Sequence, residues 1–182
     1  MEQALNHVEV PFTFAVIGDA HFKPPEAVQF EGWQGDSGRP LETEEYVENV
    51  TYALKPMMDT VQSADPSFLV LTGDVVEGAG RDDRELEAGL SFLNGYGLPL
   101  FFARGNYEPE GTFERVILPY MGQHLGWTPE ERHHFFDVVG CRFVFLDATS
   151  WEKRGGQYEW LADLLKQSQE LDLERIFLFG PY

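Results

Sequence analysis

The sequence predicts an α/β fold, in which helices pack against β-structure, and three observations indicate it. Short apolar runs alternate with longer amphipathic stretches along the chain, as they do in βαβ units. The 182 residues, 43% of them hydrophobic and 14% aromatic, suffice to bury the core of about one domain. Three of the apolar runs also end alike, in a glycine followed by an oxygen-bearing side chain. We therefore expect residues 1–182 to form a single α/β domain.

Five apolar runs have the length and composition of strands. Each is rich in Val, Phe, Leu or Ile at successive positions, which is typical of a strand covered on both faces. Together they predict a central sheet, and they lie at residues 12–17, 68–71, 98–103, 143–146 and 176–179. The turn pair Val139-Gly140 is flanked by apolar residues on both sides, so we interpret residues 132–146 as a β-hairpin.

Three stretches carry apolar side chains at helical spacing. Residues 46–61 form the first, in which Pro56 is expected to kink or interrupt the helix. Asp82 or Asp83 is placed to cap the second, whose leucines at 86, 90 and 93 share one face. The third begins at about Gln157 and continues through the leucines at 161, 164 and 165.

Two further segments have their own signals. The stretch of about 22–43 is rich in Pro and Gly and poor in apolar residues, and it predicts a long loop. Residues 128–131, Thr-Pro-Glu-Glu, have the form of a capping box with proline at the first helical position. They predict the start of a short helix.

Composition excludes several classes of protein. Thirteen Lys and Arg against 31 Asp and Glu give a net charge of −18, so bulk binding to nucleic acid or to anionic lipid is not expected. The single cysteine, Cys141, excludes an internal disulfide framework and a multi-cysteine zinc site. No signal peptide and no run of about 20 apolar residues is visible. We expect a soluble protein of the cytoplasm.

The strand ends carry the candidate chemistry. Asp19, Asp74 and Asn106 each follow the glycine that ends an apolar run, and His21 stands two residues after Asp19. Because the carboxyl ends of strands in an open α/β sheet form the ligand crevice, these side chains should converge. Two carboxylates, an imidazole and an amide oxygen suit Mn²⁺, Fe or Zn²⁺. Two such ions about 3.5–4 Å apart would bind a phosphoryl group and generate a hydroxide nucleophile.

At these residues the sequence resembles the calcineurin-like metallophosphoesterases. The pattern of that family is Asp-x-His, Gly-Asp-x-x-Asp/Glu, Gly-Asn-His-Asp/Glu, a His before Pro, and a late Gly-His-x-His. The first three motifs stand here as Gly18-Asp19-Ala20-His21, Gly73-Asp74-Val75-Val76-Glu77 and Gly105-Asn106-Tyr107-Glu108. Residues 145–161 are similar to the cyclic-nucleotide phosphodiesterase branch of the family.

The resemblance implies a β-sandwich flanked by helices and a metal-dependent phosphoesterase. Its substrate would be a phosphoester small molecule or a nucleotide, cleaved by a metal-activated hydroxide with one or two divalent ions per chain. The residues at the motif positions are Asp19, His21, Asp74 and Asn106, implied as metal ligands, and Asp74, Asn106 and Tyr107, at the catalytic positions. Glu77 and Glu108 each have two open interpretations, as a solvated carboxylate or as a residue that supports the metal ligands.

The chain also departs from the family pattern. Tyr107 replaces the His thought to protonate the leaving group, and a phenol of pKa about 10 is a poorer acid near neutrality than an imidazole of about 6.5. No His stands near Phe179-Gly180-Pro181, where the next ligand is expected. The sequence ends at Tyr182, so we expect the last strands and ligands of the family to be missing. The alternative function is therefore a catalytically impaired pseudo-phosphoesterase that acts as a binding or interaction module.

Other polar residues have simpler interpretations. Arg104 precedes the third glycine, and we favour its pairing with a carboxylate over contact with a substrate phosphate. Asp147 ends a predicted strand but has no metal role in the family pattern. The remaining histidines are interpreted as ordinary surface or core residues, namely His7, His124, His133 and His134.

Overall fold

The computed structural model describes residues 9, 11–22, 43–76, 83–108, 110–147, 156–171 and 173–180, without the side chains of 43–51 and 110. The predicted loop of about 22–43 lies outside the described residues except at its two ends. Glu77, the alternative cap Asp82, His7 and Pro181 also lie outside them.

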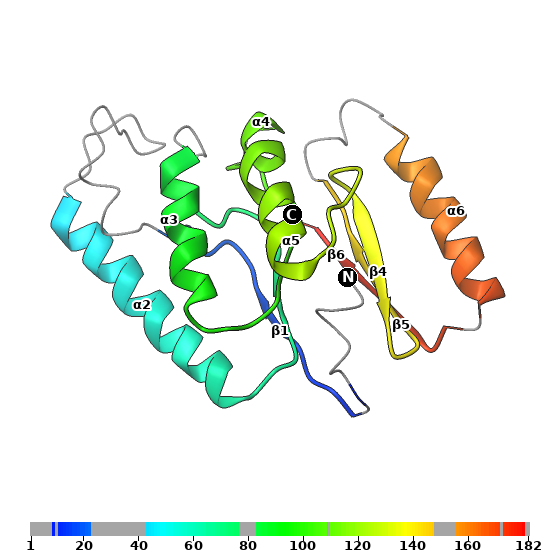
Figure 1. The fold of residues 1–182 in the computed structure, drawn as a ribbon, viewed down its shortest axis with the longest axis horizontal. Helices are drawn as coiled ribbons and strands as arrows, with labels where there is room; N and C mark the ends of the chain where they lie inside the picture. The colour runs from blue at the N-terminus through cyan, green and yellow to red at the C-terminus, as the bar shows by residue number, and fades with distance from the viewer. Residues whose placement is uncertain are drawn as a thin grey trace.

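The described strands form two three-stranded sheets, and not the one central sheet that the apolar runs indicated (Figure 1). The first sheet is parallel, in the order β1 (Ala15–Ile17), β2 (Leu69–Leu71) and β3 (Leu100–Phe102). The second has the order β4 (His134–Val138), β5 (Cys141–Phe145) and β6 (Arg175–Phe179). In it β4 and β5 form the predicted antiparallel hairpin, and β6 runs parallel to β5.

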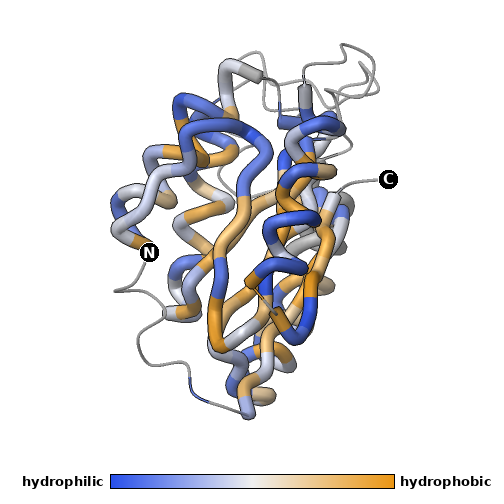
Figure 2. The backbone as a smooth tube through the Cα atoms, turned by 90° about the vertical axis from the view of Figure 1, so that its right-hand side faces the viewer, coloured by the Kyte–Doolittle hydropathy of each residue, from blue (hydrophilic) through white to orange (hydrophobic). Residues whose placement is uncertain are grey.

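The two sheets pack face to face around an aromatic core. Phe68 of the first sheet region contacts Phe143 of β5 with ring centroids 5.2 Å apart, and Phe101 of β3 lies 4.1 Å from Phe136 of β4. All four side chains are fully buried, each stabilising the fold by about 2–3 kcal/mol. Figure 2 shows the hydrophobic residues gathered along these strands in the interior. The arrangement is the β-sandwich implied by the resemblance.

Helices flank the sandwich on both sides. In Figure 1, α2 (Thr43–Ser63) and α3 (Asp83–Asn94) lie beside the first sheet, and α6 (Gln157–Glu170) lies beside the second. Leu54 and Met58 of α2 enter the main core, whereas Leu164 of α6 packs in a separate cluster with Val144 of β5. All three predicted helices are confirmed, and Pro56 lies inside α2 without ending it.

One helical run was missed by the sequence patterns. It comprises α4 (Glu110–Thr112), a π-helical turn η2 (Phe113–Ile117) and α5 (Leu118–Leu125). The glycines and the proline in this stretch weaken its helical signal, and the π-turn shifts the period of its buried face. A signal was present nonetheless, since apolar residues recur every four positions and are buried at Phe113, Ile117, Met121 and Leu125.

Two other expectations were wrong. Residues 128–131 do not begin a helix, because Gly126 ends α5 in the left-handed region at φ 64° and the chain then bends directly into β4. Coverage on both faces holds for β2, β3 and β5, which are wholly buried, but not for β1 and β6. These two lie at the edges of the described sheets, and Val16 and Leu178 are each 48% exposed.

Across the described part of the chain, no helix combines the length and the apolar character that crossing a membrane requires.

Candidate metal site

Three of the four predicted ligands meet at the carboxyl ends of β1 and β2. Asp19, His21 and Asp74 each offer a ligand atom, and these atoms all lie within 4.8 Å of one another. Nε2 of His21 is 3.9 Å from Oδ1 of Asp19. Because β1 and β2 are adjacent and parallel, the loops that follow them leave the sheet side by side.

The main chain of this cluster is held in an unusual conformation. Asp19, His21 and Asp74 have φ values of 47°, 41° and 50°, and they are three of the five non-glycine residues with positive φ in the described chain. Such conformations cost about 1–3 kcal/mol each and concentrate at functional sites. Two hydrogen bonds fix the first loop to the second: the His21 N–H donates to the Asp74 carbonyl at 2.8 Å, and the Phe22 N–H donates to the Val75 carbonyl at 2.7 Å.

The glycines of the motifs allow the second and third loops to touch. Gly73 has φ 95°, and a Cβ on it would lie 2.6 Å from both N and Cα of Gly105. A Cβ on Gly105 would in turn overlap the backbone N of Asp74, at 2.5 Å. Both positions therefore require the absence of a side chain, because backbone meets backbone.

The third loop, which follows β3, wraps around Asp74. The Tyr107 N–H donates a hydrogen bond of 2.8 Å to Oδ1 of Asp74, and the Tyr107 ring meets the His21 ring edge to face with centroids 4.7 Å apart. Asn106, the fourth predicted ligand, lies exposed between Gly105 and Tyr107 on this loop. The loop thus brings Tyr107 beside the cluster and carries Asn106 next to it in the chain.

Glu108 is deeply buried behind the cluster, with only 1% of its surface exposed. Its Oε2 accepts the N–H groups of Asp74 at 2.9 Å and Gly105 at 3.1 Å, and its Oε1 accepts that of Val75 at 2.7 Å. Of the two interpretations of Glu108, the geometry agrees with support of the ligand loops and excludes a solvated carboxylate. In the sequence, Glu108 could be recognised by its position at the end of the third motif.

Arg104 pairs with a carboxylate, as we favoured. It is 4% exposed and donates from Nη1 to Oδ1 of Asp147 at 2.8 Å, and its Nε donates to the Glu108 carbonyl at 2.8 Å. Arg132 approaches the other oxygen of Asp147, with Nε to Oδ2 at 3.3 Å. Asp147 follows β5, so this pair joins the metal-site loop of the first sheet to the second sheet.

Burial raises the pKa of two acids in this region, Glu108 and Asp74. It raises the pKa of Glu108 to about 7, although three N–H donors act in the opposite direction. It also raises the pKa of Asp74, against the hydrogen bond from Tyr107 and the nearby imidazole of His21. A bound divalent cation would favour the charged form of both carboxylates.

The donor set fits a divalent metal ion. Asp19 and His21 are partly exposed and Asp74 is buried, so solvent reaches part of the cluster. Two carboxylates and one imidazole match the preferences of Mn²⁺, Fe and Zn²⁺.

The other described histidines lie outside the cluster. His134 is buried with its ring stacked on Phe145 at 4.8 Å, and desolvation lowers its pKa to about 3. His133 meets the ring of Trp160, and His124 stacks on Tyr120. These packing contacts agree with their interpretation as ordinary surface or core residues.

Comparisons with known proteins agree with this geometry. The model of the calcineurin-like phosphoesterase family matches residues 12–180. Among solved structures, the chain is similar to a dimetal phosphatase from Danio rerio, with a TM-score of 0.64 and 16% sequence identity over 93% of this chain and 69% of that chain. A likeness at this identity shows the fold. A comparison with curated proteins finds no match.

Proposed function

The chain belongs to the calcineurin-like phosphoesterase family, and we propose that it hydrolyses phosphomonoesters or phosphodiesters with the help of divalent metal ions. The observation that carries this proposal is the convergence of Asp19, His21 and Asp74, whose ligand atoms lie within 4.8 Å of one another. Three residues from two separate strand ends meet here in strained conformations, which a solvated acidic surface does not require.

Each residue of the cluster has a place in the proposed site. Asp19, His21 and Asp74 would hold one ion, and Asp74 together with Asn106 would contribute to a second. Mn²⁺, Fe or Zn²⁺ bound there would neutralise charge on the phosphoryl oxygens and lower the pKa of a water molecule. The Tyr107 N–H holds Oδ1 of Asp74 at 2.8 Å and so orients that carboxylate.

A bound metal cation would also reduce the electrostatic repulsion between the acidic chain and an anionic substrate. A phosphoester is an anion and the chain has a net charge of −18, so bulk electrostatics oppose their encounter. Arg104 and Arg132 both contact Asp147, which occupies them with a carboxylate. Metal ions would therefore supply the positive charge that attracts the phosphoryl group.

The second candidate function is a binding or interaction module that has kept the fold and lost efficient catalysis. Tyr107 favours it, because a tyrosine stands beside His21 where the family pattern has a proton-donating histidine. Phe179 and Gly180 also favour it, since they occupy the region where the next histidine ligand is expected.

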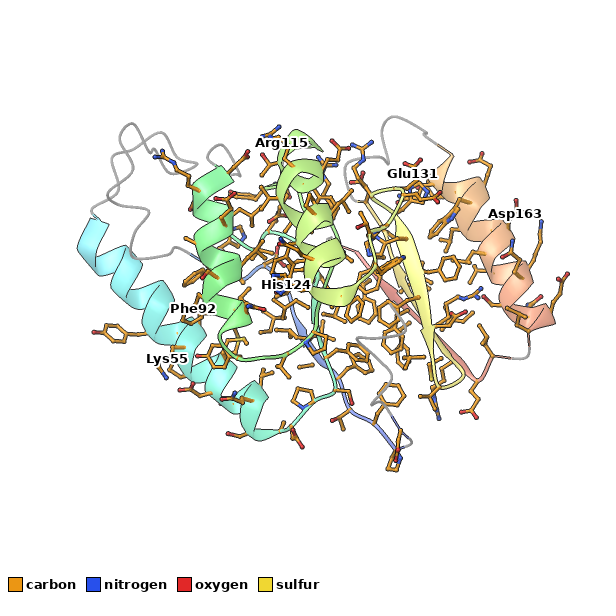
Figure 3. All side chains as sticks on the ribbon, viewed as in Figure 1. Lys55, Phe92, Arg115, His124, Glu131 and Asp163 are labelled. Atoms are coloured by element: carbon orange, nitrogen blue, oxygen red, sulfur yellow. The ribbon has the colours of Figure 1, made fainter. Side chains whose placement is uncertain are left out.

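Metal content and turnover separate the two functions. Purified protein is analysed for bound Mn, Fe and Zn, and Mn²⁺-stimulated hydrolysis of an aryl phosphate and an aryl phosphodiester is then measured. The test variant is Asp74→Asn. The matched control is Asp163→Asn, an exposed acid on the outer side of α6 (Figure 3).

Loss of metal and of turnover in Asp74→Asn alone would support the enzyme. Metal uptake without turnover would support the binding module. Absence of metal uptake, or turnover equal in both variants, would contradict the proposed phosphoesterase.

A further inference from the structure

We propose that Glu108 is the positioning residue of this site, which fixes the main chain of the loops that carry Asp74 and Asn106. The inference rests on the proposed function, because the loops in question are those of the proposed metal site. Glu108 itself lies behind the cluster, with 1% of its surface exposed, and would act on the metal only through the residues it holds.

The first step is the direction of its hydrogen bonds. Both carboxylate oxygens accept main-chain N–H groups, and the donors belong to two different loops. Asp74 and Val75 lie after β2, whereas Gly105 lies after β3. One side chain therefore ties the second and third motifs together at the point where their glycines touch.

The second step concerns Asp74. Its φ of 50° is unfavourable for a residue with a side chain, so the surrounding contacts must hold it. The bond from the Asp74 N–H to Oε2 of Glu108 acts at that residue, and the Tyr107 N–H fixes its Oδ1. Without Glu108, the Asp74 N–H would lose its partner, and the main chain that aims the Asp74 carboxylate into the cluster would be held less firmly.

The third step is the anchoring of Glu108. Its carbonyl oxygen accepts the Nε–H of Arg104 at 2.8 Å, and Arg104 is held in turn by Asp147 after β5. The main chain of Glu108 is thus linked through Arg104 to Asp147 of the second sheet, and its side chain binds the loops of the first sheet. Burying a carboxylate is costly unless its hydrogen bonds are satisfied, and here the satisfied bonds are those that shape the site.

Two variants of Glu108 make graded predictions. In Glu108→Gln, the amide keeps most hydrogen bonds when its oxygen takes the Oε2 position, which has two donors, and its NH₂ then faces the Val75 N–H. Faster hydrogen exchange is expected at Val75, with Asp74 and Gly105 still protected. Glu108→Ala should lose protection at all three amides.

Metal affinity gives the second readout. Replacing groups that hold metal ligands typically weakens metal binding 10- to 100-fold. The Kd for Mn²⁺, measured by titration calorimetry, should therefore rise about tenfold in Glu108→Gln and about 100-fold in Glu108→Ala. The control is Asp137→Asn, which removes the exposed carboxylate that pairs with the buried guanidinium of Arg142 on the second sheet. It should lower the melting temperature and leave the Kd and the three amides unchanged.

The outcomes are distinguishable. If the wild-type chain takes up no metal, the proposed function fails and this inference falls with it. If the wild-type chain binds Mn²⁺ and folded Glu108→Ala binds it with the same Kd, only the inference fails. An equal loss of affinity in Asp137→Asn would also overturn it, because the effect would then follow global stability. Glu108→Gln, which keeps the side-chain volume, tests the inference if the alanine variant does not fold.

Discussion

Replacement of Arg104 by methionine tests whether burial makes its ion pair important for stability. Arg104 and Asp147 have side chains only 5% and 2% exposed, with Nη1 and Oδ1 2.8 Å apart. Removing one partner of a buried pair costs about 3–5 kcal/mol, because the other charge remains buried without compensation. Arg132 still contacts Asp147 at 3.3 Å, so we expect the lower end of this range, about 3 kcal/mol.

The assay compares this pair with an exposed one of nearly the same geometry. Lys55 and Asp59 on α2 lie 2.7 Å apart with side chains 59% and 50% exposed, and Figure 3 shows Lys55 on the outside of the helix. Because both groups of this pair are exposed to solvent, Lys55→Met should change the free energy of unfolding much less than Arg104→Met does. Urea denaturation of both variants gives the two free energies, and the melting temperature of Arg104→Met should fall by about 6–12 °C.

Two results would refute the reasoning. If Arg104→Met and Lys55→Met lower the unfolding free energy equally, burial does not amplify the pair. A double variant, Arg104→Met with Asp147→Leu, removes both charges and should be less destabilised than Arg104→Met alone. If the double variant is less stable than Arg104→Met alone, the ion pair contributes net stability beyond the cost of an unpaired charge.

Three further predictions concern single positions. Gly73→Ala should lower the free energy of unfolding by about 3 kcal/mol or more, because the added Cβ would lie 2.6 Å from the Gly105 backbone. The control is Gly97→Ala, which is also at positive φ but has open space around it, and it should cost about 1 kcal/mol. Urea denaturation measures both free energies. Burial lowers the pKa of His134 to about 3 in the folded chain, whereas in the unfolded chain the pKa is about 6.5. Between these values only the unfolded chain binds the proton, so the free energy of unfolding should fall by about 1.4 kcal/mol per pH unit as the pH drops from 6 towards 4. His134→Phe should reduce the slope by this amount in urea titrations at several pH values, and an unchanged slope would exclude the assignment. Tyr107→His should raise Mn²⁺-dependent turnover of an aryl phosphate about 10- to 100-fold near neutral pH, and Tyr107→Phe should change this rate less than about tenfold. An equal rate in Tyr107→His and the wild-type chain would argue against proton donation from this position.

The predictable part of this protein is the part encoded in local patterns. Strands β2 and β3 are wholly buried, so their apolar runs stand out against polar neighbours. The glycines at 73 and 105 are visible in the sequence itself, because each follows an apolar run and marks the end of its strand. Because β1 and β2 are parallel neighbours, strand ends alone are enough to bring Asp19, His21 and Asp74 together.

What the patterns did not predict depends on contacts between distant residues. The division of the strands into two sheets follows from which strands pair, and apolar runs alone do not encode pairing. The run from α4 to α5 combines a π-turn with Gly111 and Pro119, so its buried face departs from the ordinary helical period. The role of Glu108 required knowing that three N–H groups from two loops point at one buried position.

The charge of the chain takes on a different meaning once these contacts are known. Asp147 is matched by Arg104 and Arg132, and Glu108 by main-chain donors, so the buried acids behind the site are already satisfied by protein groups. Asp19 and Asp74 differ from them, because they are gathered with His21 at strand ends and face one another across less than 4.8 Å. Acids placed this closely repel when both are ionised, so one of them holds its proton more tightly unless a cation lies between them. The positive charge that the sequence lacks overall is therefore needed at this one place, where a metal ion would both stabilise the cluster and attract an anionic substrate.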